Sequence, residues 1–162
     1  MHESRGRPGE RLRNRRRGGK TLIVHLLREG ERPILIVWRE DFSTGIAEVD
    51  HRHKALIWLV NGLSEAFRTS KDPETLGTIL SILADYASFH FTRGQRLMRT
   101  ARYPVRDEYA ALHEELMKRL DTLVYRFETG SGGAETLPFL KDWLLRLIDQ
   151  DRAFGRALAA EP

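Results

Sequence analysis

The sequence predicts an all-α fold: an antiparallel, up-down-up-down four-helix bundle preceded by an extended, basic N-terminal arm. Two observations predict this fold. Apolar residues recur at alternating steps of three and four in four stretches of the chain, which is the pattern of one buried helix face. Turn-forming residues separate these stretches by short distances, so consecutive helices must pack antiparallel. The length of 162 residues suits a single domain.

The N-terminal segment differs in charge from the rest of the chain. Over residues 1–20, eight Lys or Arg side chains stand against two Glu, a net charge of +6, whereas the whole chain carries +4. We interpret 1–32 as a basic, disordered leader and 33–162 as the bundle domain. A basic tail can bind nucleic acid. We do not expect that here, because glycines interrupt the segment and no aromatic residues interleave with its charges. Residues 21–46 have no helical period, which favours an extended arm with weak strand character.

The first two helices are marked by their apolar stripes and by the turn between them. The first pattern begins at Ile46 and stops near Ser70. Asp72 is a good N-cap and Pro73 a good first residue for the second helix, which must end before Tyr103-Pro104. The first stripe is Ile46, Val49, His53, Leu56, Val60, Leu63 and Phe67, and the second is Leu76, Leu80, Leu83, Ala87, His90, Gly94 and Leu97.

The last two helices follow the same rule. A glycine-rich turn, 130–133, separates their patterns. The third stripe is Tyr109, His113, Leu116, Leu120, Leu123 and Phe127, and the fourth is Leu140, Leu144, Leu147, Asp151, Phe154 and Leu158.

Polar residues on these inward stripes are the candidates for a functional site. His53, His90 and His113 come from helices one to three, and Asp151 comes from helix four. Residues equidistant from the turn of an antiparallel pair lie level, and this rule places all four within about one helical turn of the same height. Three imidazoles and a carboxylate that converge in a core are typical ligands of Fe, Mn or Zn. The alternative is that these groups only hydrogen-bond one another.

Several classes of function are excluded or disfavoured. The chain has no Cys, so it has no disulfide and no thiolate-held metal centre. The apolar runs 22–27 and 34–38 are too short to span a bilayer, and we expect a cytoplasmic protein. There is no P-loop and no HExxH motif. Asp151 is the single carboxylate assigned to the interior, which leaves no acid/base pair, so we do not expect an enzyme.

The chain is similar to the bacterial hemerythrins (bacteriohemerythrins) over roughly residues 38–158. The residues that carry the resemblance, in the same order and spacing, are Trp38, the run 45–56 (Gly-Ile-Ala-Glu-Val-Asp-His-Arg-His-Lys-Ala-Leu), Asn61-Gly62-Leu63, Tyr86, His90-Phe91, Leu97-Met98, Tyr103-Pro104, His113, Trp143-Leu144 and Asp151-Arg152-Ala153-Phe154.

The resemblance implies a non-haem di-iron centre that binds O₂, with five His and two bridging carboxylates as ligands. Four residues of this chain match that set: His53, His90, His113 and Asp151. Three positions depart from it. Gly94 stands where a bridging Glu belongs, Tyr109 where a second His of the third helix belongs, and Leu147 where the His of the fourth helix belongs. Asp151 follows Leu147 by four residues, where the family spacing is five.

Three interpretations follow. In the first, the chain is a divergent hemerythrin-like protein with an incomplete site. It holds iron, as one ion in place of two, on the four matching residues, with Tyr109 as an additional phenolate ligand and O₂ as the small-molecule partner. In the second, it is a metal-free hemerythrin-fold module whose surface binds a protein partner. In the third, it associates with nucleic acid through the basic leader. We favour the first.

Overall fold

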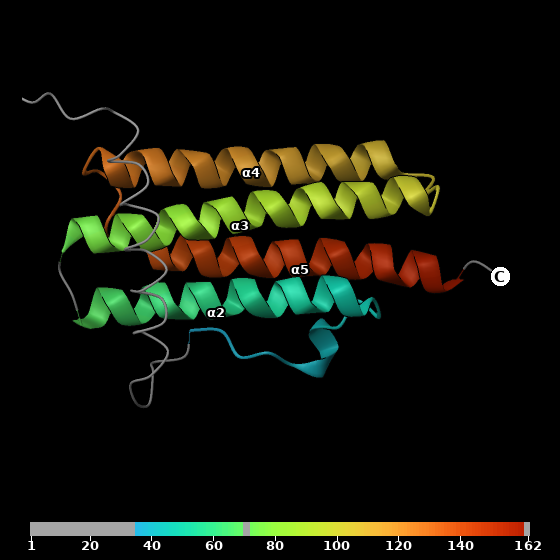
Figure 1. The fold of residues 1–162 in the computed structure, drawn as a ribbon, viewed down its shortest axis with the longest axis horizontal. Coiled ribbons are helices and arrows are strands. Elements are labelled where there is room, and N and C mark those ends of the chain that lie inside the picture. Colours follow the sequence, from blue (N-terminus) through green and yellow to red (C-terminus); the bar gives the residue numbers. More distant parts are fainter. Residues whose placement is uncertain (1–34, 70–71, 161–162) are drawn as a thin grey trace, which may run out of the picture.

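The predicted all-α bundle is confirmed. The computed structural model describes residues 35–69 and 72–160, and this part of the chain contains helices and no strands. The elements are η1 (Glu40–Phe42), α2 (Ala47–Thr69), α3 (Pro73–Thr100), α4 (Arg106–Glu128) and α5 (Thr136–Ala160). Figure 1 shows the four long helices running alternately in opposite directions. Helix α2 packs on α3 and α5, and α4 packs on the same two neighbours, so the four helices enclose one core.

The turn between α2 and α3 is built as the sequence indicates. The Asp72 carboxylate accepts hydrogen bonds from the backbone N–H groups of Glu74 and Thr75, at 3.2 and 3.1 Å, and Pro73 opens the helix. Helix α3 ends at Thr100, where the backbone turns through Arg102 at a φ of 53° and reaches Tyr103. These local signals set the helix ends and hence the height of each inward residue.

The arm before α2 differs in part from the expectation. The predicted weak strand character is wrong for residues 35–46, which hold the short helix η1 and no strand. The physical reason is that the arm forms hydrogen bonds with a side chain of α2 and not with another strand. Its backbone pairs with the Asn61 side chain, which accepts from the N–H groups of Leu35 and Ile36 at 2.9 and 3.0 Å and donates to the Ile36 carbonyl at 2.8 Å. The leader predicted for 1–32 lies outside the described residues.

The core has two parts along the bundle axis. The part that the four helices share near the α2–α3 turn is built of large aliphatic side chains and is called here the apolar half. Its members are fully buried: Val60, Leu63, Leu80, Leu83, Leu120, Leu140 and Leu144. The other part contains the polar stripe residues. Trp143 lies in the core as well, 0% exposed, and its indole N–H donates to the Leu116 carbonyl at 2.9 Å.

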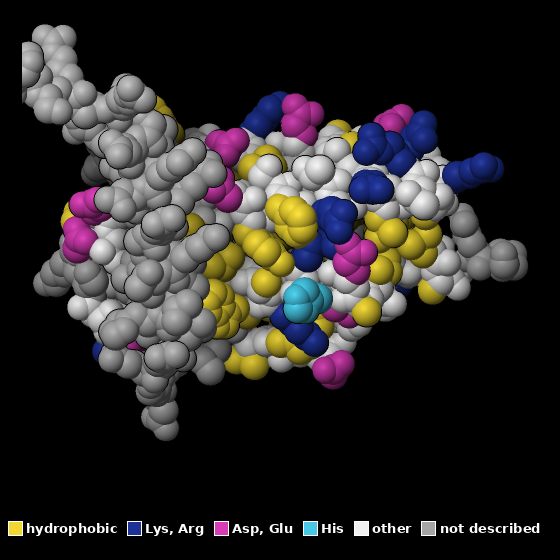
Figure 2. Space-filling model, in the orientation of Figure 1, with side chains coloured by type: hydrophobic (Ala, Val, Ile, Leu, Met, Phe, Trp, Pro, Cys, Tyr) yellow, Lys and Arg dark blue, Asp and Glu magenta, His cyan; other side chains and the backbone are white. Residues whose placement is uncertain are grey.

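The surface carries mixed charge with one basic region. Figure 2 shows Lys and Arg side chains gathered toward the end of the bundle where α5 terminates. Exposed arginines from the end of α3, the α3–α4 connection, the start of α4 and the end of α5 lie at this end: Arg96, Arg99, Arg102, Arg106 and Arg156. None of the described helices is long and apolar enough to cross a membrane.

Candidate metal centre

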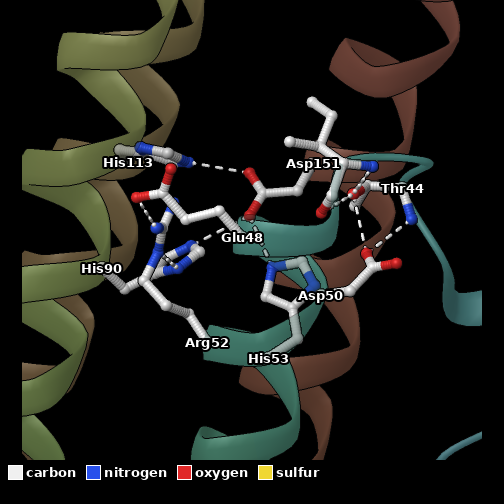
Figure 3. A network of polar contacts seen from close by, with 9 residues as sticks. Thr44, Glu48, Asp50, Arg52, His53, His90, His113 and Asp151 are labelled. Atoms are coloured by element: carbon white, nitrogen blue, oxygen red, sulfur yellow. Dashed lines mark hydrogen bonds and ion pairs between the residues drawn. The ribbon is translucent and has the colours of Figure 1, made fainter.

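Four polar side chains, one from each long helix, meet in the core. His53 of α2, His90 of α3, His113 of α4 and Asp151 of α5 are each at most 1% exposed. Figure 3 shows the three imidazoles arranged around the aspartate. The predicted convergence at one height is therefore what the structure has. The ring centroids of His53 and His90 lie 5.0 Å apart, and those of His90 and His113 lie 6.2 Å apart.

All three imidazoles direct the same ring atom at the Asp151 carboxylate. The Nε2 atoms of His53 and His90 lie 2.6 and 2.9 Å from Oδ2. The Nε2 atom of His113 lies 3.2 Å from Oδ1. One carboxylate therefore contacts imidazoles from three other helices.

The electrostatics of this cluster favour an ionised Asp151 carboxylate beside neutral His90 and His113 rings. Burial alone would raise the pKa of Asp151, but hydrogen bonds from His53 and His90 outweigh it and lower that pKa below its usual value. Burial lowers the pKa of His90. Burial, reinforced by the nearby His90 and His53, lowers the pKa of His113 to about 2. An ionised carboxylate can only accept, so in this arrangement each Nε2 carries the proton.

The opposite ring nitrogens have very different surroundings. The Nδ1 atoms of His53 and His113 are buried and have no hydrogen-bond partner among the described residues. The Nδ1 atom of His90 faces the Arg52 side chain, whose Nε lies 3.3 Å away. Arg52 is itself 3% exposed and donates through Nη1 to Glu48 at 2.6 Å. Sequence reasoning missed Arg52, because an arginine beside a stripe residue normally points to solvent.

The segment before α2 fixes the height of His53. The Asp50 carboxylate accepts from the N–H and hydroxyl of Thr44, at 2.8 and 2.7 Å, and from the Ser43 hydroxyl at 2.6 Å. The Thr44 carbonyl in turn rests against α5 at Gly155, where a Cβ atom would lie 1.9 Å from the carbonyl oxygen. This close approach requires glycine. It joins the start of α2 to the turn of α5 that follows Asp151.

The positions that depart from the hemerythrin ligand set are occupied in three different ways. Gly94 has no side chain that could contact His113, and a Cβ there would lie 3.5 Å from His113 Cε1. Leu147 is fully buried and belongs to the apolar core. Tyr109 packs its ring on His113 at a centroid distance of 4.0 Å, in a separate cluster with Met98 and Phe154, and no polar contact joins it to Asp151 among the described residues.

The donor set fits one metal ion better than two. His53, His90 and Asp151 each offer a ligand atom, and these atoms all lie within 4.8 Å of one another. His113 stands outside this compact group, although its Nε2 reaches Asp151 Oδ1. Two imidazoles and one carboxylate form the facial set used by mononuclear iron centres. A second cation would lack anionic ligands, because Asp151 is the one carboxylate buried among the described residues.

A pocket of about 480 Å³ opens between α3 and α4 beside His113. Its walls combine apolar side chains, such as Phe91 and Met117, with polar ones, such as Gln95 and Glu114. His113 is also one of its lining residues, although the residue is only 1% exposed.

Comparison with known proteins gives a consistent result. Residues 44–152 match the family model described as "Hemerythrin HHE cation binding domain". The chain is 30% identical over 119 residues to a bacteriohemerythrin of Pseudomonas aeruginosa, covering 73% of this chain and 77% of that protein. It is 31% identical over 128 residues to a bacteriohemerythrin of Stenotrophomonas maltophilia, covering 78% and 83%.

Solved structures agree with the sequence relatives. A crystal structure of a hemerythrin point mutant superposes with a TM-score of 0.70 at 26% identity, covering 78% of this chain and 99% of the other. The range matched by the family model, 44–152, contains His53, His90, His113 and Asp151.

Proposed function

The chain belongs to the hemerythrin family, and on that premise we propose that it binds a single iron ion through His53, His90 and Asp151, with His113 as a fourth ligand. The observation that carries this proposal is the shared orientation of the three Nε2 atoms toward one buried carboxylate, at 2.6, 2.9 and 3.2 Å. Burying these four polar groups inside the bundle is costly. A bound cation would offset that cost by coordinating the buried ring nitrogens and the carboxylate.

The number of ions follows from the anionic ligands. The hemerythrin resemblance implies two bridging carboxylates, and here the first is replaced by Gly94. Asp151 alone can neutralise one charge of a divalent ion, whereas two ions of like charge would repel one another across a single bridge. Tyr109 is not required as a ligand, because its ring is packed against His113. Iron would supply the capacity to bind a small molecule such as O₂.

Access for such a molecule is supported by the pocket beside His113. His113 is one of the residues that line this pocket, between α3 and α4. The residues of the chain would hold the ion, exclude bulk water through the surrounding helices and leave the α3–α4 side as an approach. Oxygen carriage or sensing is the activity that this arrangement favours.

Metal content tests the proposal directly. The full chain is produced in iron-supplemented medium, and metal is measured after purification. We expect about one iron per chain, lost in His90→Ala and retained in the control His51→Ala, because the His51 side chain is exposed on α2. A chelator should then lower the melting temperature of the wild type by removing a ligand of the folded state. About two irons per chain would contradict the single-ion proposal.

A metal-free interaction module is the second candidate, and one observation favours it. Every Nε2 of the cluster already has a carboxylate partner, so the core is held together without an ion. In that case no metal co-purifies, a chelator leaves the melting temperature unchanged, and the function lies on the bundle surface. The metal analysis above separates the two candidates.

A further inference from the structure

Arg52 is a buried cation that the metal-ligand set does not use. Its side chain is 4% exposed, and its three guanidinium nitrogens have different surroundings. Nη1 donates to Glu48 Oε1 at 2.6 Å, Nε donates to His90 Nδ1 at 3.3 Å, and Nη2 is buried without a partner in the described structure. A guanidinium is rarely buried unless its position has a specific use, because desolvating the charge is costly.

The contact with His90 fixes which ring nitrogen carries the proton. A guanidinium has N–H donors and no acceptor, so His90 Nδ1 must be bare where it faces Arg52 Nε. The proton of the neutral ring is then on Nε2, where it points at Asp151 Oδ2, 2.9 Å away. Both neighbours of the His90 ring therefore demand the same tautomer.

Metal binding demands the opposite tautomer. An imidazole that ligates through Nε2 must present a bare Nε2, and its Nδ1–H normally donates to a carboxylate or carbonyl, which raises the basicity of the ligand. In this chain the residue behind His90 is a donor instead of an acceptor. If the ring proton moved to Nδ1, two N–H groups would face each other across 3.3 Å.

We infer that Arg52 is a positioning residue that holds His90 in the hydrogen-bonded tautomer and thereby weakens metal binding at this site. The inference rests on the proposed function and specifies how that site is regulated. Loading requires the guanidinium to leave His90. The guanidinium could then move toward Glu48, because the Glu48 carboxylate already accepts a hydrogen bond from Nη1 and its side chain is 57% exposed. Metal binding would therefore replace the Arg52–His90 contact with an Arg52–Glu48 contact nearer the surface.

A histidine tautomer measurement tests the first half of the inference without any metal. Nitrogen NMR on isotope-labelled histidine distinguishes a protonated from a bare ring nitrogen. In the metal-free full chain we expect His90 to be protonated at Nε2. In Arg52→Gln the amide oxygen can accept from Nδ1–H, so the ring should populate the other tautomer. A wild-type His90 protonated at Nδ1 would overturn the inference.

An Fe²⁺ titration under anaerobic conditions tests the second half. Removing a donor behind the ligand should tighten Fe²⁺ binding in Arg52→Gln by about ten- to a hundred-fold, the range seen when residues behind a metal ligand are changed. Arg93→Gln is the matched control, because Arg93 also lies near Glu48, at 3.8 Å, but is exposed and does not contact His90. Its Fe²⁺ affinity should equal that of the wild type.

The outcomes separate the two proposals. Unchanged or weaker Fe²⁺ binding in Arg52→Gln, with binding still measurable in the wild type, would overturn the role of Arg52. If neither protein binds Fe²⁺, the proposed function fails, and the tautomer measurement on the wild type alone decides whether Arg52 fixes His90. Should Arg52→Gln fail to fold, Arg52→Met removes the same donor with a side chain suited to a buried position and is expected to tighten Fe²⁺ binding as well.

Discussion

The two ends of the core use the same four helices and obey different rules. In the apolar half, Leu63, Leu80 and Leu120 fill space, and any well-packed set of similar volume would serve. In the polar layer of His53, His90, His113 and Asp151, each atom depends on whether its neighbour donates or accepts. The same helical period therefore encodes two kinds of core. The apolar half accepts substitutions that keep the side-chain volume, whereas the polar layer accepts only substitutions that keep each donor facing an acceptor.

The polar layer should be the more sensitive to a change that keeps its shape. Asp151→Asn preserves volume but leaves three imidazole donors around a neutral group that also donates. We expect a loss of about 3–5 kcal/mol in the free energy of unfolding, because three buried hydrogen bonds to a charged acceptor, each worth about 1.5–3 kcal/mol, are weakened or lost. Urea denaturation measures it, with Asp149→Asn as the control, because Asp149 is exposed on the same helix. Equal stabilities would show that the layer is not a network.

The apolar half should respond to lost volume. Leu83 is fully buried at its centre, so Leu83→Ala should lower the free energy of unfolding by about 2–5 kcal/mol through lost transfer energy and a cavity. The change should leave metal content per folded chain unaltered, because Leu83 belongs to the other end of the core. Leu112→Ala is the control, since Leu112 is 43% exposed. A loss of metal in folded Leu83→Ala would mean that the two ends are not independent.

The contact between the arm and α5 joins the polar layer to its surroundings. A methyl group at Gly155 would overlap the Thr44 carbonyl, so Gly155→Ala should cost about 1–3 kcal/mol of stability. Gly62→Ala is the matched control inside a helix, where a Cβ would meet nothing within 4 Å. That variant should be neutral or slightly stabilising. Thermal unfolding of both proteins gives the comparison, and similar melting temperatures would contradict the close approach.

The smallest expected effect is pH-dependent and comes from Asp50. Burial alone would raise its pKa, but hydrogen bonds from Ser43 and Thr44 hold it below the usual 3.8. Because the pKa of Asp50 is lower in the folded than in the unfolded chain, the ionised carboxylate stabilises the folded protein at pH values above the unfolded pKa. This stabilisation is lost as the pH falls through the folded pKa. Asp50→Asn should therefore lose about 1 kcal/mol at pH 7, with screening by solvent, and less than that at pH 3, below the unfolded pKa. Urea midpoints at both pH values test this sign.

The bundle and its polar layer follow largely from the sequence, because periodicity is local. The step pattern brings His53, His90, His113 and Asp151 to one height, and the Asp72-Pro73 signal defines a helix start that the structure shares. Periodicity could not find Arg52, since its burial depends on two partners, Glu48 and His90, on different helices. Nor did it place Trp143 in the core, because a large side chain reaches further than its helical angle suggests.

The enclosed indole of Trp143 offers a built-in optical probe. It is the one tryptophan that is 0% exposed in the described part of the chain, and its ring lies 6.3 Å from that of Phe91, which in turn stacks 4.4 Å from His113. Its emission should be blue-shifted by the dry surroundings, and a paramagnetic ion in the polar layer would quench it. With Trp38 and Trp58 replaced by phenylalanine, fluorescence intensity alone would report occupancy as it changes in real time.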